Sequence, residues 1–369
     1  MRLLLIARPF VFHGGVERAT AGLVEALVAA GVEVHLLSPP GQQPVPGVTL
    51  HRLPLPPLPS AARALALAVG ARLVVARRSW DVVQSHERTL AQDVYRAGEG
   101  CHRAYLASRG APAARGVYHR VVLALERRVF ARTREIVAIA RRGAREIGEL
   151  HGVGAERLSV VYNGVDLARF HPRHRAAWRG PARDEAGVPR AAPVLLFVGS
   201  GFERKGLGTA LEALAALPDR ASRLVVVGKG EPGPWRRAAE RLGVAGRVAW
   251  LGPRPDPERW YAAADLVVLP SRYEPFGQVH LEALAAGVPV VGSREAGGAE
   301  LIEDGVNGAV VDPRDAQALA RAVGRLRALP ADELEAAARR SAEPYTYARQ
   351  VAGYASVYRR LGAATPDFP

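Results

Sequence analysis

The chain has 369 residues, 49% of them hydrophobic, which is enough for two domains with separate cores. Its single cysteine, Cys101, excludes an internal disulfide, and no Cys/His cluster has the spacing of a zinc site. The net charge of +14, from 50 basic and 36 acidic residues, raises the question of an acidic partner such as nucleic acid or anionic lipid.

The first half of the chain alternates short apolar runs with helical patterns, as expected of an α/β protein. No apolar run approaches the ~20 residues of a membrane span, and we expect a cytoplasmic protein. Helices are predicted over 17–30 and over 118–130, where apolar residues recur at helical spacing. Strands are predicted at 3–7, 32–37, 48–53, 82–84 and 136–140.

Three features of this half are candidates for function. Gly14 and Gly15 form a turn between the first strand and a helix, which is either an anion-binding turn or an ordinary one. Residues 101–145 contain 11 arginines and two acidic residues. Arg120 and Arg127 recur at heptad spacing opposite the apolar stripe of their helix, and form either a cationic ridge toward a membrane or a solvated face. His86 and His102 lie near strand ends and are either structural or catalytic.

The α/β pattern restarts after Asn163-Gly164-Val165-Asp166 and the charged stretch 171–190, where we place the hinge between two doubly wound halves. The domains are therefore 1–172 and 173–345, and the last helix, within 346–369, is expected to pack back on the first half. Strands of the second half are predicted at 194–198, 224–227, 248–251, 266–269, 288–291 and 309–311.

The segment from Gly199 to Gly208 joins a strand to a helix and contains Arg204 and Lys205. Glycines let a backbone approach an anion, the start of a helix offers N–H donors, and the two cations add charge. The segment is not a Walker A loop, because Leu207 stands where that motif requires lysine. It is either a phosphate-binding loop or an ordinary turn with two solvated cations.

Glu274 and Glu282 lie eight positions apart around a glycine-containing turn into a helix, in Glu274-Pro-Phe-Gly-Gln-Val-His-Leu-Glu282. Glu274 is expected in the loop, and Glu282 in the helix that begins near Gln278. The backbone N–H groups of Gly277, Gln278 and Val279 lie between the two carboxylates and are placed to bind an anion or a sugar hydroxyl. This pattern suits a ligand with many hydroxyls and a phosphate.

Together these motifs resemble the family 4 glycosyltransferases of the GT-B fold, over nearly the whole chain. The Glu274-x7-Glu282 signature, the Ala-x-Ala-x-Gly-x-Pro-Val segment after it and Asn163-Gly164-Val165-Asp166 carry the resemblance. The segments around Arg204-Lys205 and Cys101-His102 look most like the lipopolysaccharide core glucosyltransferases. The resemblance implies two Rossmann-like domains facing a central cleft, with 1–172 and the C-terminal helix binding the acceptor and 173–345 binding the nucleotide-sugar donor.

The resemblance also implies residue roles. Arg204 and Lys205 would bind the donor diphosphate and, with Glu274, act in catalysis. Glu274 would bind sugar hydroxyls and Glu282 the ribose. The backbone from Phe276 through Gly277 and Gln278 to Val279 would hold sugar and phosphate, and Gly15 would approach the diphosphate. On the acceptor side the candidates are Glu17, His86 and His102, since Ala19 replaces the acidic residue expected just after Gly14-Gly15.

We therefore expect a retaining hexosyltransferase, with UDP-glucose as donor and the inner-core heptose of lipopolysaccharide as acceptor. No Asp-x-Asp motif occurs, so we expect no metal and no cofactor, with the two cations stabilising the leaving group. The expected partners are the donor, a lipid-linked oligosaccharide and the anionic surface of the inner membrane, contacted peripherally by a monomer. Mannosyl or galactosyl transfer is the alternative within the family. A basic nucleic-acid-binding protein is the alternative outside it, disfavoured by an aromatic content of 6%.

Overall fold

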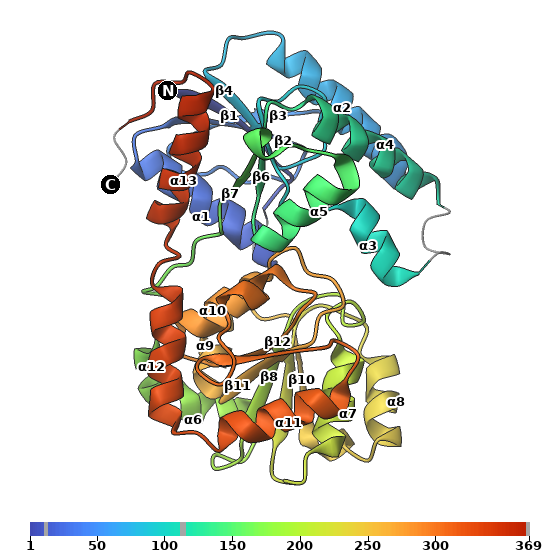
Figure 1. Cartoon of the computed structure of the whole chain (residues 1–369), viewed down its shortest axis with the longest axis vertical. Helices are drawn as coiled ribbons and strands as arrows, with labels where there is room; N and C mark the ends of the chain where they lie inside the picture. The colour runs from blue at the N-terminus through green and yellow to red at the C-terminus, as the bar shows by residue number, and fades with distance from the viewer. Residues whose placement is uncertain (11–13, 111–115, 367–369) are drawn as a thin grey trace. The chain divides into compact units, whose positions relative to one another are not determined.

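The computed structural model describes residues 1–10, 14–110 and 116–366, which form two compact units (Figure 1). Of the described residues, the first unit contains 1–10, 16–110, 116–164 and 347–366, and the second contains Gly14, Gly15 and Val165–Thr346. The chain leaves the first unit a few residues before the predicted boundary at residue 172 and returns to it for the last helix.

In the described residues, the first unit contains one parallel sheet, ordered β3-β2-β1-β4-β5-β6-β7, and the second contains another, ordered β10-β9-β8-β11-β12-β13. The strands are β1 (Arg2–Ile6), β2 (Glu33–Ser38), β3 (Val48–Arg52), β4 (Val82–Ser85), β5 (Val94–Arg96), β6 (Glu135–Ala138), β7 (Leu158–Val160), β8 (Val194–Val198), β9 (Arg223–Val227), β10 (Val248–Gly252), β11 (Leu266–Leu269), β12 (Val290–Ser293) and β13 (Gly308–Val311).

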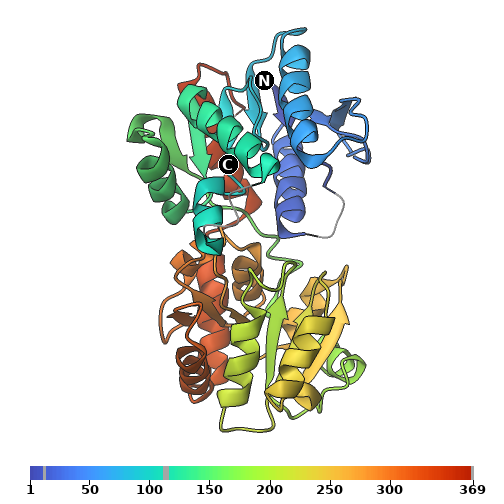
Figure 2. The same cartoon turned by 90° about the vertical axis from the view of Figure 1, so that its right-hand side faces the viewer.

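Helices flank both sheets (Figure 2). They are α1 (Gly15–Ala29), α2 (Ser60–Val75), α3 (His102–Arg109), α4 (Val117–Arg132), α5 (Arg141–His151), α6 (Arg175–Glu185), α7 (Leu207–Ala216), α8 (Gly233–Arg241), α9 (Pro257–Ala263), α10 (Gln278–Ala285), α11 (Ala316–Arg327), α12 (Ala331–Ala342) and α13 (Tyr347–Arg360). Parallel strands joined through helices give the doubly wound architecture that the sequence predicts.

The core of the first unit follows from the two-residue period of strand β1. Leu3 and Leu5 point into a cluster formed with α1 and α13, whereas Leu4 and Ile6 point into a second cluster formed with α2. Helix α13 contributes Tyr354 and other fully buried side chains to the first of these clusters. The C-terminal helix is therefore part of the first unit.

In the second unit, helix α10 is buried at all eight positions, so it lies inside the unit. It follows β11 directly, and β11 lies in the middle of its sheet between β8 and β12. The loops that leave β8 and β11 start at the same, carboxyl edge of the parallel sheet, where ligands bind in doubly wound domains. The two motifs of this unit are thus brought to one edge.

The structure differs from the predicted elements at a few places. The strand expected at 288–291 begins at Val290, because Gly287 ends α10 with φ +73° and Val288 N–H still donates to the Ala283 carbonyl at 2.8 Å. Strands β5 and β7, of three residues each, were not predicted. Helix α2 was not predicted either, because it has little polar character on any side and lacks a helical period.

Candidate functional site

In the second unit, Arg204, Lys205 and Glu274 form one ion cluster. The Lys205 ammonium contacts Glu274 Oε2, and Arg204 Nη1 donates to the same oxygen at 2.7 Å and to the Tyr273 carbonyl at 2.9 Å. The side chains of Lys205 and Glu274 are 8% and 12% exposed, whereas that of Arg204 is 33% exposed. The structure therefore joins the two predicted motifs through their charged side chains.

The charges in this cluster are unequally compensated. Burial by itself would raise the pKa of Glu274, but the charges of Lys205 and Arg204 outweigh burial and lower that pKa to about 2. Burial also lowers the pKa of Lys205, and the attraction of Glu274 does not fully offset it. The charged form of Glu274 is thus well stabilised, whereas the charge of the Lys205 ammonium is only partly compensated.

Two glycine-dependent turns position these side chains. Gly206 precedes α7 with φ +79°, and a Cβ atom there would lie 2.0 Å from the Pro270 carbonyl oxygen, so only glycine fits between the loop and the end of β11. Gly277 precedes α10 with φ +89°, and Gln278 and Val279 begin that helix. A helix start is where backbone N–H groups lack i−4 carbonyl partners, and in this turn the His280 N–H donates to the Gly277 carbonyl at 2.9 Å.

The turn at Gly277 is held from two sides. The Gly298 N–H donates to the Phe276 carbonyl at 2.5 Å, and Glu274 N–H donates to the Glu295 carbonyl at 3.0 Å. His280 Nδ1 lies 3.1 Å from the Gly277 carbonyl oxygen. Phe276 is 1% exposed and packs in the interior. The backbone from 276 to 279 is therefore fixed before any ligand binds.

Glu282 lies on α10 and is 1% exposed. The Tyr261 hydroxyl donates to Glu282 Oε2 at 2.9 Å. Sequence reasoning did not select Tyr261, since a tyrosine within a buried helix gives no separate signal. This contact orients the carboxylate to which the family resemblance assigns the ribose.

In the first unit, a pocket contains Glu17 and His86, two of the acceptor-side candidates. Its polar lining also includes side chains that sequence reasoning did not select: Arg8, Glu87, Arg96 and Glu99. Arg8 follows β1, Glu87 follows β4 and Arg96 ends β5, so the carboxyl ends of parallel strands bring them together. That position, rather than any motif, is the signal that could have identified them.

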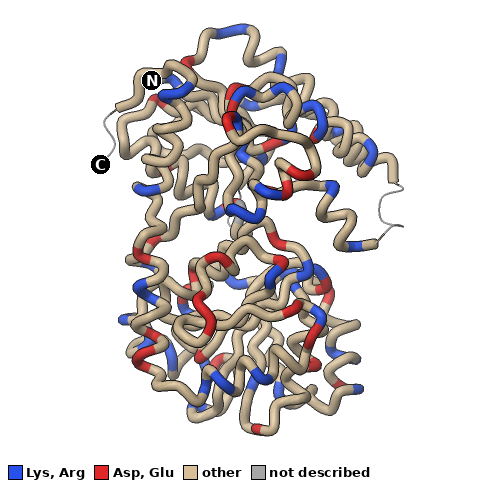
Figure 3. The backbone as a smooth tube through the Cα atoms, viewed as in Figure 1, with Lys and Arg blue, Asp and Glu red and all other residues tan. Residues whose placement is uncertain are grey.

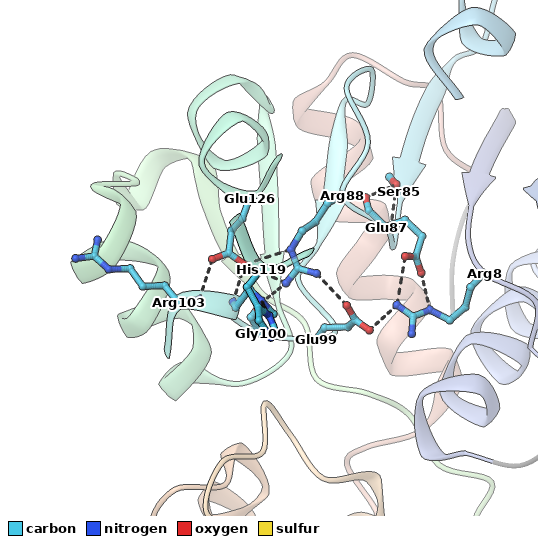
Figure 4. Close-up of polar contacts among 10 residues, drawn as sticks. Arg8, Ser85, Glu87, Arg88, Glu99, Gly100, Arg103, His119 and Glu126 are labelled. Atoms are coloured by element: carbon cyan, nitrogen blue, oxygen red, sulfur yellow. Dashed lines mark hydrogen bonds and ion pairs between the residues drawn. The ribbon is translucent and has the colours of Figure 1, made fainter. Parts of the chain in front are cut away.

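An ion network extends from this pocket into the unit (Figure 4). Arg8 binds Glu87 at 2.8 Å and also contacts Glu99, which accepts from Arg88 at 2.9 Å. Arg88 in turn binds Glu126 at 3.0 Å. Burial by itself would raise the pKa of Glu99, but Arg8 and Arg88 lower it, so the carboxylate stays charged. The network fixes the loops that follow β1, β4 and β5 in the chain.

His86 is 7% exposed, and its ring nitrogens lie 2.9 Å from Gln84 Nε2 and 3.5 Å from Thr20 Oγ1. Burial, together with the charges of Arg96 and Arg8, lowers the pKa of His86 well below its usual value, so the imidazole is neutral. It therefore brings no charge to the pocket.

The remaining candidates lie elsewhere. His102 begins α3, where its N–H donates to Glu126 at 2.6 Å and its ring contacts His119 at 3.0 Å, so it belongs to the ion network and not to the pocket lining. Gly15 begins α1. Arg120 and Arg127 are exposed on α4. Within residues 1–10, 14–110 and 116–366, no group of three or more His, Cys, Asp or Glu side chains is arranged to hold a metal ion.

Residues 192–328 match the family described as Glycosyl transferases group 1, and residues 13–169 match Glycosyltransferase Family 4. The D-inositol 3-phosphate glycosyltransferase of Xylanimonas cellulosilytica is 31% identical over 398 residues, covering 96% of this chain and 93% of that protein. The chain also matches several other D-inositol 3-phosphate glycosyltransferases, and it spans about half of their length.

Two solved structures are similar in fold. WaaG, a glycosyltransferase involved in lipopolysaccharide biosynthesis, has a TM-score of 0.82 at 24% identity, covering 99% of this chain and 100% of that one. Anabaena Alr3699/HepE in complex with UDP-glucose has a TM-score of 0.75 at 20% identity, with the same coverage. At these identities the likeness shows the fold, which is GT-B as predicted. Together, the family matches and the full-length relative show that the chain belongs to the family 4 glycosyltransferases.

Proposed function

We propose that this protein is a retaining, metal-independent glycosyltransferase that transfers glucose from UDP-glucose to a hydroxylated acceptor. The observation that carries the proposal is the ion cluster of Arg204, Lys205 and Glu274, in which Lys205 is buried and incompletely compensated. A diphosphate would supply the missing negative charge. A UDP-sugar as donor is supported by the fold-related HepE structure, which is described as a complex with UDP-glucose.

In the proposed complex, the diphosphate lies against Arg204 and Lys205 and against the N–H groups that begin α10. Glu274 accepts hydrogen bonds from sugar hydroxyls, and Glu282, oriented by Tyr261, accepts them from the ribose. Each acidic side chain thus recognises a different part of the donor.

The reaction breaks the bond between the anomeric carbon and the diphosphate oxygen and forms a bond from that carbon to an acceptor oxygen on the same face. The acceptor hydroxyl passes its proton to the departing phosphate oxygen. The two cations lower the barrier by stabilising the charge that develops on the leaving diphosphate. No acidic residue is needed as a nucleophile in this scheme.

Two acceptors are supported by different observations. The sequence resemblance and the WaaG-like fold favour the inner-core heptose of lipopolysaccharide. The full-length relative from Xylanimonas cellulosilytica is instead named for D-inositol 3-phosphate, which favours a soluble sugar-like phosphate. The pocket containing Glu17 and His86 is the proposed acceptor site in either case.

A lipid-linked acceptor would place the protein, as a monomer, on the cytoplasmic face of the inner membrane. Helix α2 exposes Leu65, Val69 and Leu73 at 44%, 49% and 58%, and it packs beside α4, which exposes Arg120 and Arg127. The sequence has no Asp or Glu from 34 to 80, and basic residues follow both helices (Figure 3). An apolar stripe beside arginines is suited to an anionic lipid surface. No described helix is long and apolar enough to cross a membrane.

A donor screen tests the proposed function. Purified protein is incubated with UDP-, GDP- or ADP-sugars and with either a heptose-containing core glycolipid or D-inositol 3-phosphate, and the released nucleotide and the product anomer are measured. We expect UDP release with UDP-glucose and a product that keeps the donor's anomeric configuration. Release of GDP alone would indicate mannosyl transfer, and an inverted product would contradict the retaining mechanism.

A further inference from the structure

Arg96 in the first unit is a buried cation without a counter-ion. It is 2% exposed, and no carboxylate among the described residues lies within 4.0 Å of its guanidinium. Its Nη2 donates to Asn163 Oδ1 at 2.8 Å, and its Nε has no hydrogen-bond partner. Burying an unpaired charge is costly, and arginine cannot lose its proton to avoid that cost. In the protein alone, the charge of Arg96 is therefore not compensated by a counter-ion.

The groups around Arg96 do not supply the missing charge. Asn163 is neutral, and burial raises the pKa of the nearby Tyr354 to about 12 although Arg96 acts in the opposite direction, so the phenol is uncharged. Gly98 leaves room for the guanidinium, since a Cβ atom at that position would lie 2.2 Å from Arg96 Nη1. The chain thus accommodates the arginine at the pocket without neutralising it.

The acidic residues of the same pocket divide into two kinds. Glu87 and Glu99 are both bound to Arg8, and Glu99 is bound to Arg88 as well, so their charges are already compensated. Glu17 is half-buried in the first turn of α1, and its carboxylate has no ion pair within 4.0 Å among the described residues. The pocket therefore presents one uncompensated guanidinium and one uncompensated carboxylate.

We propose that Arg96 binds an anionic oxygen group, a phosphate or a carboxylate, on the acceptor that occupies this pocket, while Glu17 accepts hydrogen bonds from its hydroxyls. The ligand class is thus a hydroxylated anion, such as a sugar phosphate. The planar guanidinium suits such a group, because it offers paired donors to two oxygens. This inference rests on the proposed function, in which the pocket holds the acceptor, and it adds the chemical group that the acceptor must carry.

A binding experiment tests the anion site without any donor. Inorganic phosphate is titrated by calorimetry into the parent protein, Arg96→Gln and Arg96→Lys, each with Lys205→Ala to remove the donor-side cation. We expect Arg96→Gln to weaken phosphate binding about tenfold or more, and Arg96→Lys to lie between. Arg247→Gln is the matched control, because Arg247 is also buried, at 9% exposure, and donates to the backbone carbonyls of Ser222 and Asp219.

Thermal unfolding in phosphate-free buffer adds a second reading. Arg96→Gln removes an uncompensated buried charge, so its melting temperature should equal or exceed that of the parent, whereas added phosphate should stabilise the parent alone. Phosphate binding that is unchanged by Arg96→Gln, or absent in the parent, would overturn the proposal. If Arg96→Gln does not fold, Arg96→Lys decides, since full phosphate affinity with a lysine would exclude recognition through the guanidinium.

The transfer reaction then separates the sources of the anion. The KM for the acceptor is compared between parent and Arg96→Gln, using D-inositol 3-phosphate against inositol, and a core glycolipid before and after phosphatase treatment. If Arg96→Gln raises the KM of the phosphorylated member of one pair and not of the other member, that pair identifies the acceptor as soluble or lipid-linked. If parent and Arg96→Gln have equal KM values for both pairs, the proposal is overturned. Phosphate binding through Arg96 without any transfer would instead contradict the proposed function and leave the anion site standing.

Discussion

At the scale of single residues, Glu274 has one role without donor and a second role in the proposed complex with donor. Without donor, Glu274 partly neutralises Lys205 and Arg204. In the proposed complex the diphosphate takes over that task, and the carboxylate becomes available for the sugar. Burial makes this exchange effective, because charges in a dry site interact strongly and must always be compensated.

The pKa of Glu274 gives a pH-dependent prediction. Its value is lowered from 4.5 to about 2 in the folded state, so the stability it contributes is complete above pH 4.5 and is lost as the pH falls toward 2. Glu274→Gln should be less stable than the parent at neutral pH by on the order of 3 kcal/mol, and the difference should shrink between pH 4.5 and 2. Urea unfolding of both proteins across this range measures it. A difference that does not change with pH would show that the carboxylate's charge is not stabilising.

The residues of the ion cluster in the second unit are easier to select from the sequence than those of the pocket in the first unit. Two short segments of the sequence contain the residues of this cluster and Glu282, and the spacing within each segment already indicates a ligand-binding motif. These residues are Arg204, Lys205, Glu274 and Glu282. Arg8 and Glu87 come from separate segments, and Arg96 and Glu99 from a third, and only the order of the strands brings the three segments together. Their roles could not be predicted without knowing which loops share an edge of the sheet. His102, selected for its position near a strand end, contacts the ion network because α3 begins there.

At the scale of elements, the turns before α7 and α10 position the side chains that are proposed to bind the donor. Gly206 and Gly277 both have positive φ, and each lies where a side chain would collide with its neighbours. Helix α10 was predicted to begin at Gln278 or Val279, and it begins at Gln278. Helix α2 was missed because its exposed side is apolar, which removes the polar and apolar alternation that identifies a surface helix.

Gly206→Ala should destabilise the second unit and abolish donor binding. The alanine would adopt an unfavourable φ and place Cβ 2.0 Å from the Pro270 carbonyl oxygen, which must move and displace the adjacent Lys205. The matched control is Gly243→Ala, where φ is +67° but nothing lies within 4 Å. We expect ~1 kcal/mol for the control and several times that for Gly206→Ala, measured by urea unfolding. Equal costs for the two variants would mean that the close approach at Pro270 is unimportant.

The surface formed by α2 and α4 predicts binding to anionic vesicles. Parent protein should sediment with liposomes that contain phosphatidylglycerol, and should be released as salt is raised. Leu65→Ser with Val69→Ser should weaken binding at all salt concentrations, whereas Arg120→Gln with Arg127→Gln should weaken it mainly at low salt. Binding that is absent, or equal on neutral vesicles, would remove membrane association from the proposal.

At the scale of the whole molecule, two doubly wound units divide the proposed labour. The motifs proposed to bind the donor lie in Val165–Thr346, and the pocket with Arg96 lies in the unit that α13 completes. The alternation of strands and helices predicts two units, because each unit repeats the same pattern around its own sheet. The acceptor could not be predicted in the same way, since the fold is shared by proteins with different activities and the site alone carries the chemistry.

The central claim is that buried cations, without a metal, bind and stabilise the donor diphosphate. Calorimetric titration of UDP in the presence of EDTA tests it most directly, with parent protein, Lys205→Ala and, as a control, Lys229→Ala, which replaces the only other lysine. We expect the parent to bind UDP in EDTA, Lys205→Ala to bind about tenfold or more weakly, and Lys229→Ala to retain most of the affinity. Binding that requires a divalent ion, or that survives Lys205→Ala unchanged, would contradict the account.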